Sequence, residues 1–128
     1  MTERASTEHF ALGTKIAIEA LKALLLVNGG AATALIALTT KAAKSPNYSI
    51  PVLLFGSAAL LNSFTLVVGY FSQLSYANHC LSFENGEAAA AKTQLDRHEF
   101  MQWIAIGLVI AGFAFSVAGM ATAFAEAR

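Results

Sequence analysis

The chain has little charge. Of its 128 residues, eight are Lys or Arg and eight are Asp or Glu, so charged residues make up only 12%, about half the share found in soluble domains. A water-soluble surface needs charged side chains, whereas 56% of this chain is hydrophobic. A soluble globular domain is therefore excluded, and most of the surface is expected to face lipid.

Other features are scarce or absent as well. A single cysteine, Cys80, excludes an intramolecular disulfide and any paired-cysteine metal or redox site. The net charge is zero and no basic stripe occurs, which argues against a nucleic-acid partner. The sequence contains no Gly-rich phosphate loop, no G-x-S-x-G and no H-E-x-x-H. We therefore expect neither enzyme activity nor a cofactor.

Three uncharged runs are long enough to cross a bilayer. A hydrocarbon core of about 30 Å needs roughly 20 apolar residues in a helix, and the runs are 23–40, 50–71 and 100–124. They do not alternate apolar and polar residues as barrel strands do, so helices are the structure that satisfies their backbone groups. The residues before the first run mix acids and bases, unlike a removable signal peptide. The sequence predicts an all-α integral membrane protein with one domain, 1–128.

The links between the three runs differ in character. Residues 41–49 include Pro46 and predict a tight hairpin, after which Pro51 suits the start of the next helix. The second run continues a helical pattern to a stop at Asn85 and Gly86, and strong helix formers precede the third run. With three crossings, these extensions and the N-terminal segment leave the membrane on one side. We expect a short helical stalk there.

Basic residues near the spans predict the orientation. The stalk side holds Arg4, Lys15, Lys22, Lys92 and Arg97, and the hairpin side holds Lys41, Lys44 and Arg128. Because the side richer in Lys and Arg usually faces the cytoplasm, the N-terminus is expected to be cytoplasmic.

The stretch EALKALLLVNGGAAT, residues 19–33, resembles the first helix of a family of small bacterial inner-membrane proteins without a characterised activity. The resemblance covers about the first third of the chain. It implies a multi-pass protein of the bacterial inner membrane, and it carries over no functional residue.

A polar stripe runs along the second span at helical spacing. Its members are Asn62, Thr65, Gly69, Ser72 and Tyr76, with Gln73 close by. Polar side chains that face lipid are costly, so the stripe is expected to face protein or water. Two interpretations stay open. The stripe either forms hydrogen bonds between helices, or lines an aqueous or dewetting constriction in a symmetric oligomer.

Small residues predict helix-packing seams on the first and third spans. They are Asn28, Gly29, Gly30 and Thr33 on the first, and Gly112, Ser116 and Gly119 on the third. Small residues let helix backbones approach closely, and an amide in lipid seeks a hydrogen bond across the interface. These seams exceed what one three-helix unit can occupy, so we predict a homo-oligomer.

Two polar clusters lie near the stalk. Lys15, Glu19 and Lys22 share a helical face and predict an interfacial salt-bridged segment, with a partner-binding or gating cluster as the alternative. The second cluster contains metal-capable residue types but no H-x-x-E or C-x-x-C pair, so ordinary polar helix ends and no metal are expected; it comprises His79, Cys80, Asp96, His98 and Glu99, with Glu8 and His9 on the same side.

Three functions are compatible with this layout. The first is a homo-oligomeric pore or ion channel, by analogy of size and layout with phage holins and small membrane effectors of bacterial defence. The alternative is a structural or accessory subunit that packs against a larger membrane complex through the Gly112 groove and the stalk charges. A transporter ranks third, because neither an inverted repeat nor a charged residue within a span is present.

Overall fold

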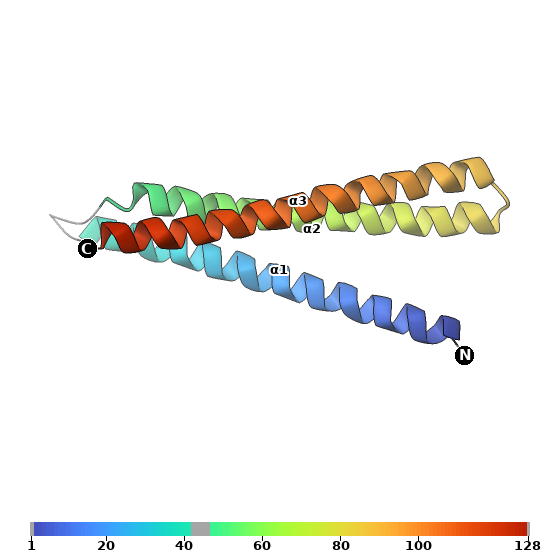
Figure 1. Cartoon of the computed structure of the whole chain (residues 1–128), viewed down its shortest axis with the longest axis horizontal. Coiled ribbons are helices and arrows are strands. Elements are labelled where there is room, and N and C mark those ends of the chain that lie inside the picture. Colours follow the sequence, from blue (N-terminus) through green and yellow to red (C-terminus); the bar gives the residue numbers. More distant parts are fainter. Residues whose placement is uncertain (1, 42–46, 128) are drawn as a thin grey trace.

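The chain folds into long α-helices with short connections. The computed structural model describes the backbone of residues 2–41 and 47–127, and within these ranges the side chains from Thr14 onward except those of Ile16, Thr40 and Lys41. The helices are α1 (Thr2–Lys41), α2 (Ser49–Glu84) and α3 (Ala88–Glu126) (Figure 1). Each contains a stretch long and apolar enough to cross a membrane. The predicted all-α architecture with three spans is therefore confirmed.

The helices are longer than the bilayer requires. The 36 residues of α2 and the 39 of α3 correspond to about 54 and 58 Å at 1.5 Å per residue, against a hydrocarbon core of about 30 Å. Ser72 of α2 contacts His98 of α3, next to the last charged residue before the uncharged part of α3. Beyond this level α2 continues to Glu84 and α3 begins at Ala88, and we expect these two segments to extend past the bilayer as a helical pair.

The connection from α2 to α3 has the predicted stop. Gly86 has φ +76°, a left-handed conformation that glycine adopts at little cost. The backbone amide of Asn85 donates to the Leu81 carbonyl at 3.1 Å, and that of Glu87 donates to the Ser82 carbonyl at 2.9 Å. These bonds satisfy carbonyls that the helix end leaves without partners, and α3 begins directly afterwards.

The other connection joins α1 to α2. It lies between Lys41 and Ser49, and Pro46 of the predicted hairpin lies outside the described residues. At its end, the Asn47 side-chain oxygen accepts hydrogen bonds from the Ser49 backbone amide at 3.2 Å and from the Ser49 hydroxyl at 2.6 Å. The Asn47 side chain therefore orders the first turn of α2.

The helix α2 is the central element of the bundle. It packs along α3 over most of its length and more sparsely against α1, whereas α1 and α3 barely touch. Figure 1 shows α1 beside the pair at the hairpin end and diverging from it toward the N-terminus. The expected stalk is therefore built from α2 and α3, and α1 does not pack into it as a third helix.

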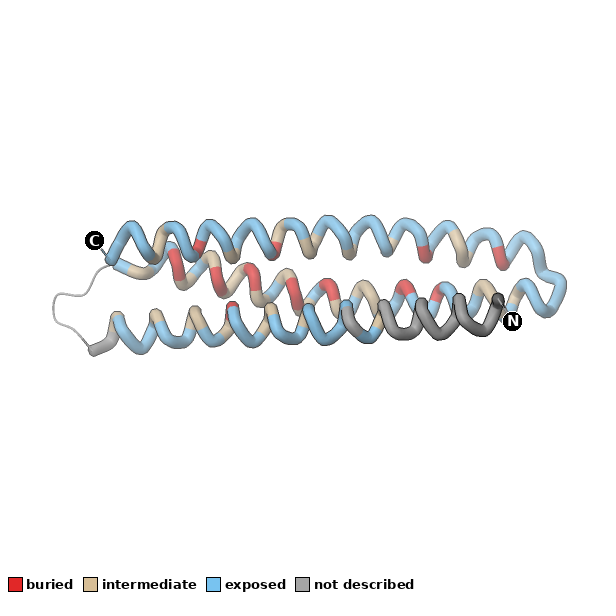
Figure 2. Tube along the Cα trace, turned by 60° about the horizontal axis from the view of Figure 1, so that its bottom comes forward, coloured by how far each residue is buried: buried red, intermediate tan, exposed pale blue. Residues whose placement is uncertain are grey.

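The buried residues of α2 lie along one face of that helix (Figure 2). They are Pro51, Phe55, Ala58, Asn62, Thr65, Ser72 and Ser75. Many large apolar side chains instead point outward, among them Leu26, Leu53 and Phe113, each more than half exposed. An exterior of this kind suits lipid, because acyl chains solvate leucine and phenylalanine as well as a protein interior does.

Candidate functional site

Two asparagines lie buried in the middle of the membrane-spanning region. Asn28 of α1 and Asn62 of α2 are each 1% exposed. Asn28 is 13 residues before Lys41 and Asn62 is 13 residues after Ser49, so both lie at equal depth, about 20 Å along the helices from the hairpin link at 1.5 Å per residue. Among the described residues, neither amide nitrogen nor oxygen has a hydrogen-bond partner.

The amide of Asn62 lies against α3 where that helix has no side chain. A Cβ atom built on Gly112 would lie 2.8 Å from the Asn62 Oδ1 atom, which is too close for a real contact. Seven residues further along α3, a Cβ atom built on Gly119 would lie 3.2 Å from the Phe55 ring. The structure thus places both glycines in the α2–α3 seam, where small residues let large or polar side chains of α2 approach the α3 backbone.

The other predicted packing residues lie in less crowded surroundings. Cβ atoms built on Gly29 and Gly30 would meet nothing within 4 Å. Thr33 is exposed and its hydroxyl donates to the Gly29 carbonyl of its own helix at 2.8 Å. Ser116 is half-buried and its hydroxyl donates to the Gly112 carbonyl at 2.8 Å. Within one chain, the small residues of α1 beside Asn28 are therefore open to another helix.

The polar stripe of α2 is divided between the interior and the surface. Asn62, Thr65 and Ser72 are buried, and the Thr65 hydroxyl donates to the Leu61 carbonyl at 2.9 Å. Gly69 is half-buried, whereas Gln73 and Tyr76 are exposed. The burial of Asn62, Thr65 and Ser72 agrees with the first interpretation, in which the stripe forms contacts between helices. That the stripe lines a pore in an assembly of several chains stays a prediction.

A histidine seam joins α2 to α3 beyond the asparagines. His98 is 6% exposed, and its Nδ1 atom lies 2.9 Å from both the hydroxyl and the carbonyl oxygen of Ser72. The Tyr76 ring packs 5.1 Å from the imidazole. With the proton on Nδ1, the imidazole donates to the Ser72 carbonyl, which fixes the register of the two helices.

A second histidine repeats the arrangement one heptad further along. His79 Nδ1 lies 2.8 Å from the carbonyl oxygen of Ala91 and can donate to it. The expectation of an ordinary polar helix end is therefore wrong for His98, which is buried and hydrogen-bonded across the seam. The sequence contains a signal for this pairing of α2 with α3. Ser72 and His79 are seven residues apart, as are Ala91 and His98, and residues seven apart lie on the same face of a helix.

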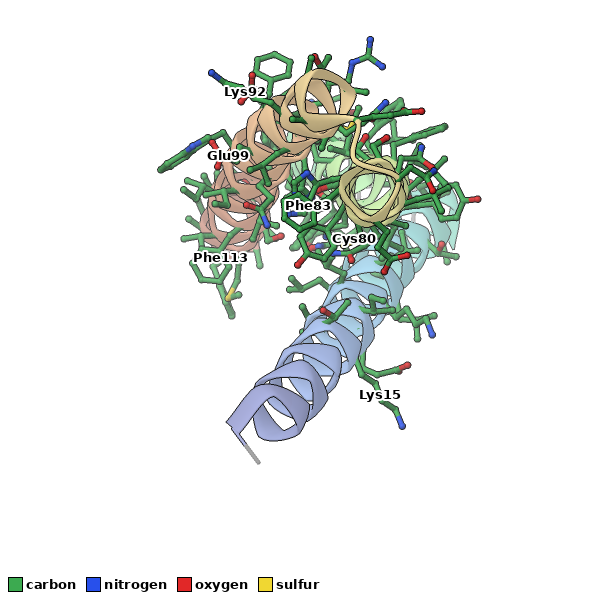
Figure 3. The ribbon with its side chains drawn as sticks, turned by 90° about the vertical axis from the view of Figure 1, so that its right-hand side faces the viewer. Lys15, Cys80, Phe83, Lys92, Glu99 and Phe113 are labelled. Carbon is green, nitrogen blue, oxygen red and sulfur yellow. The ribbon has the colours of Figure 1, made fainter. Side chains whose placement is uncertain are left out.

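The charged cluster on α1 is only partly paired. Lys22 Nζ lies 3.0 Å from Glu19 Oε1, and both side chains are more than half exposed, so solvent screening leaves the pair little effect on stability. Lys15 forms no ion pair among the described side chains, and Figure 3 shows it directed away from the α2–α3 pair. Among the described residues, no three His, Cys, Asp or Glu side chains gather as a metal site would require.

A cleft of about 500 Å³ opens where α1 diverges from the α2–α3 pair. It is lined by side chains of α1 between Thr14 and Leu21, of α2 between Thr65 and Gln73, and of α3 between Ala105 and Ile110. Most of these side chains are apolar. On α1 and α2 these residues lie between the two buried asparagines and the stalk.

No protein-family model matches the chain, and searches of curated proteins and of solved structures find no match.

Proposed function

We propose that the protein is a homo-oligomeric membrane protein whose copies together form a pore. The observation that carries the proposal is the pair of buried amides of Asn28 and Asn62, which lie at one depth within the spans and have no hydrogen-bond partner among the described residues. Leaving a polar group without a partner in an apolar environment costs several kcal/mol. Polar residues kept at such a position are usually functional.

Separation of α1 from α2 would expose the amide of Asn28, and water would reach Asn62 once α2 also parts from α3 at Gly112, against which the Asn62 amide lies. Only α2 holds α1 in place to any extent, because α1 and α3 barely touch. In an oligomer, water entering between the parted helices would hydrate Asn28 and Asn62, together with Thr65 and the exposed Gln73 further along α2. A path of this kind is an ordinary way to build a conducting pore from polar side chains.

Surfaces for self-association remain available on the closed chain. Gly29 and Gly30 leave open space beside α1. The helix α3 also presents exposed small residues at helical spacing, Gly107, Ala114, Ala118 and Ala121. Such surfaces allow close helix contacts in lipid, and closed symmetric rings are the common outcome for small subunits. From the resemblance of its first helix, we propose the bacterial inner membrane as the location, with the N-terminus in the cytoplasm.

The test compares conductance in planar bilayers for the purified protein and for the double variant Asn28→Leu with Asn62→Leu. Leucine resembles asparagine in shape but cannot bind water, so we expect channel currents from the unmodified protein and loss of most current in the variant. Thr33→Val is the matched control, since Thr33 is an exposed polar residue of the same span, and its currents should persist. Absence of current in the unmodified protein, or equal currents in the double variant, would refute the pore.

One observation favours the accessory-subunit alternative. Leu81 and Phe83 are 58% and 71% exposed although they lie on the part of α2 that projects beyond the bilayer, where water would surround them. Exposed apolar side chains of this kind often mark a protein contact. Purification in mild detergent separates the alternatives, because a particle made only of this chain favours the pore and stoichiometric recovery with a larger protein favours the accessory role.

A further inference from the structure

We propose that an interfacial anchor on the outside of the three helices holds the chain at a fixed depth in the bilayer, in contact with the lipid headgroups of the stalk-side leaflet. The anchor consists of Tyr70 on α2, Trp103 on α3, and Glu19 with Lys22 on α1. The inference does not depend on pore formation, because it concerns the contact of a single chain with lipid. It rests on the level at which these residues lie, on their chemistry, and on their distance from the other end of α2.

Tyr70 and Trp103 lie at nearly the same depth on the two helices of the pair. Ser72 of α2 contacts His98 of α3 across the seam, and from this contact the spans run deeper as residue numbers decrease along α2 and increase along α3. Tyr70 is two residues and Trp103 five residues from the contact, which corresponds to about 3 and about 8 Å of depth. Both side chains point outward, with 66% and 73% of their surface exposed. They therefore meet the surroundings of the bundle within about 5 Å of one plane.

The helix α1 brings a charged pair to the same level. Leu21 of α1 and Tyr70 of α2 line the same cleft, which places the next residue, Lys22, beside the level of Tyr70. Lys22 Nζ lies 3.0 Å from Glu19 Oε1, and both side chains are more than half exposed. Charges that face hydrocarbon are costly, whereas a lysine near the end of a span extends its amine to the headgroups. The ion pair therefore marks the depth at which α1 leaves the hydrocarbon.

The aromatic residues at this level are of the two types that membrane interfaces favour. Tryptophan and tyrosine are enriched where the bilayer meets water, because their rings are apolar and their N–H or O–H groups need a polar partner. The chain has one Trp and three Tyr, and Tyr76 packs against His98 on the stalk side of the proposed plane. Neither Trp, Tyr nor a charged residue occurs between this plane and the hairpin, over 23–40, 49–69 and 104–124. A boundary at Tyr70 and Trp103 therefore leaves every span free of interfacial and charged residues.

The distance from this plane to the hairpin end matches one bilayer. Tyr48 directly precedes α2 and is 22 residues before Tyr70, which corresponds to about 33 Å of helix. A hydrocarbon core is about 30 Å thick. Immersion of the whole of α2, about 54 Å long, would instead place Asp96 and Arg97 of α3 in hydrocarbon. The proposed plane therefore leaves both histidine contacts of the α2–α3 seam at or beyond the headgroups.

The experiment measures the depth of Trp103, the one tryptophan of the chain, by fluorescence quenching in phosphatidylcholine vesicles. The lipid acyl chains carry bromine, which quenches tryptophan, either near the headgroup or near the terminal methyl group. We expect the shallow bromine to quench Trp103 several-fold more strongly than the deep bromine. Two variants in a Trp103→Phe background provide matched depths. Phe113→Trp lies ten residues deeper on α3, and Phe83→Trp lies 13 residues beyond Tyr70 on α2; both positions are more than half exposed.

The two variants should give opposite results. The tryptophan introduced by Phe113→Trp should be quenched best by deep bromine, because it lies about 15 Å further into the bilayer. The one introduced by Phe83→Trp should be quenched by aqueous acrylamide and by neither lipid. The proposal is overturned if deep bromine quenches Trp103 more strongly than shallow bromine, if neither lipid quenches Trp103, or if Phe83→Trp responds to lipid as Trp103 does. Circular dichroism confirms that each variant is folded.

A second measurement tests whether these residues hold the depth. In vesicles with longer acyl chains, Trp103 of the unmodified protein should stay at the shallow level. Tyr70→Leu combined with Lys22→Leu should let it move inward, so that the ratio of shallow to deep quenching falls about twofold or more. Leu60→Ile is the control, since Leu60 is exposed on the same span and the change removes no polar group, so its ratio should match that of the unmodified protein. An unchanged ratio in the double variant would overturn the anchor.

Discussion

Replacing the buried amides by leucine should make the closed fold more stable. Asn28 and Asn62 are almost completely covered and none of their four polar side-chain atoms has a partner among the described residues. Unfolding within a micelle lets an amide reach water or another polar group, whereas the closed bundle denies it both. Each amide therefore favours the open or unfolded chain, and its removal should favour the closed one.

The expected magnitude follows from the cost of burying an unsatisfied amide. Mutational data on proteins put this cost at about 1–3 kcal/mol, so each single variant should gain about that much free energy of unfolding. Because neither amide is hydrogen-bonded to the other, the gains should add, with a coupling energy below about 0.5 kcal/mol. Leucine at position 62 must still fit over Gly112, which limits the gain there to the lower part of the range.

The assay is a double-mutant cycle. Helicity is followed by circular dichroism while sodium dodecyl sulfate displaces a mild detergent, for the unmodified protein, both single variants and the double variant. Thr33→Val serves as control and should change stability by less than about 0.5 kcal/mol, since its hydroxyl is exposed and bonds only to its own helix. Single variants that lose more than about 1 kcal/mol, with a coupling energy of similar size, would mean that the amides satisfy each other and would refute the reasoning.

Two further predictions concern the α2–α3 seam. Gly112→Leu should destabilise the fold by about 1–3 kcal/mol through overpacking, because even a Cβ there collides with Asn62, whereas Gly107→Leu on the same helix meets open space and should be neutral in the same detergent titration. His98→Leu should lower stability by about 1–2 kcal/mol, because it removes the contact with Ser72; an unchanged unfolding midpoint would show that this contact contributes nothing.

The spans and the turn could be predicted from the sequence because their causes are local. Uncharged runs of sufficient length must be helical in lipid, and Asn85 followed by Gly86 ends a helix through the left-handed glycine conformation. The polar character of Asn62 and the small size of Gly112 also indicated that both lie near another helix. None of these inferences required knowledge of how one helix is rotated against the next.

Rotation and register could not be predicted, for a physical reason. Lipid tails are as apolar as leucine, so hydrophobicity does not distinguish the face of a span that meets protein from the face that meets lipid. For this reason the seam that contains Gly29 and Gly30 looked equivalent to the one that contains Gly112, although only the latter is packed within the chain. The contact of His98 with Ser72 likewise depends on the register of two helices, which no single segment specifies.

The loose attachment of α1 has a consequence for biosynthesis. A ribosome delivers α1 to the membrane before α2 and α3, and at that moment α2, its extensive partner among the described helices, has not been made. The span must therefore stay inserted on its own hydrophobicity, while the next two spans pair with each other through their short turn.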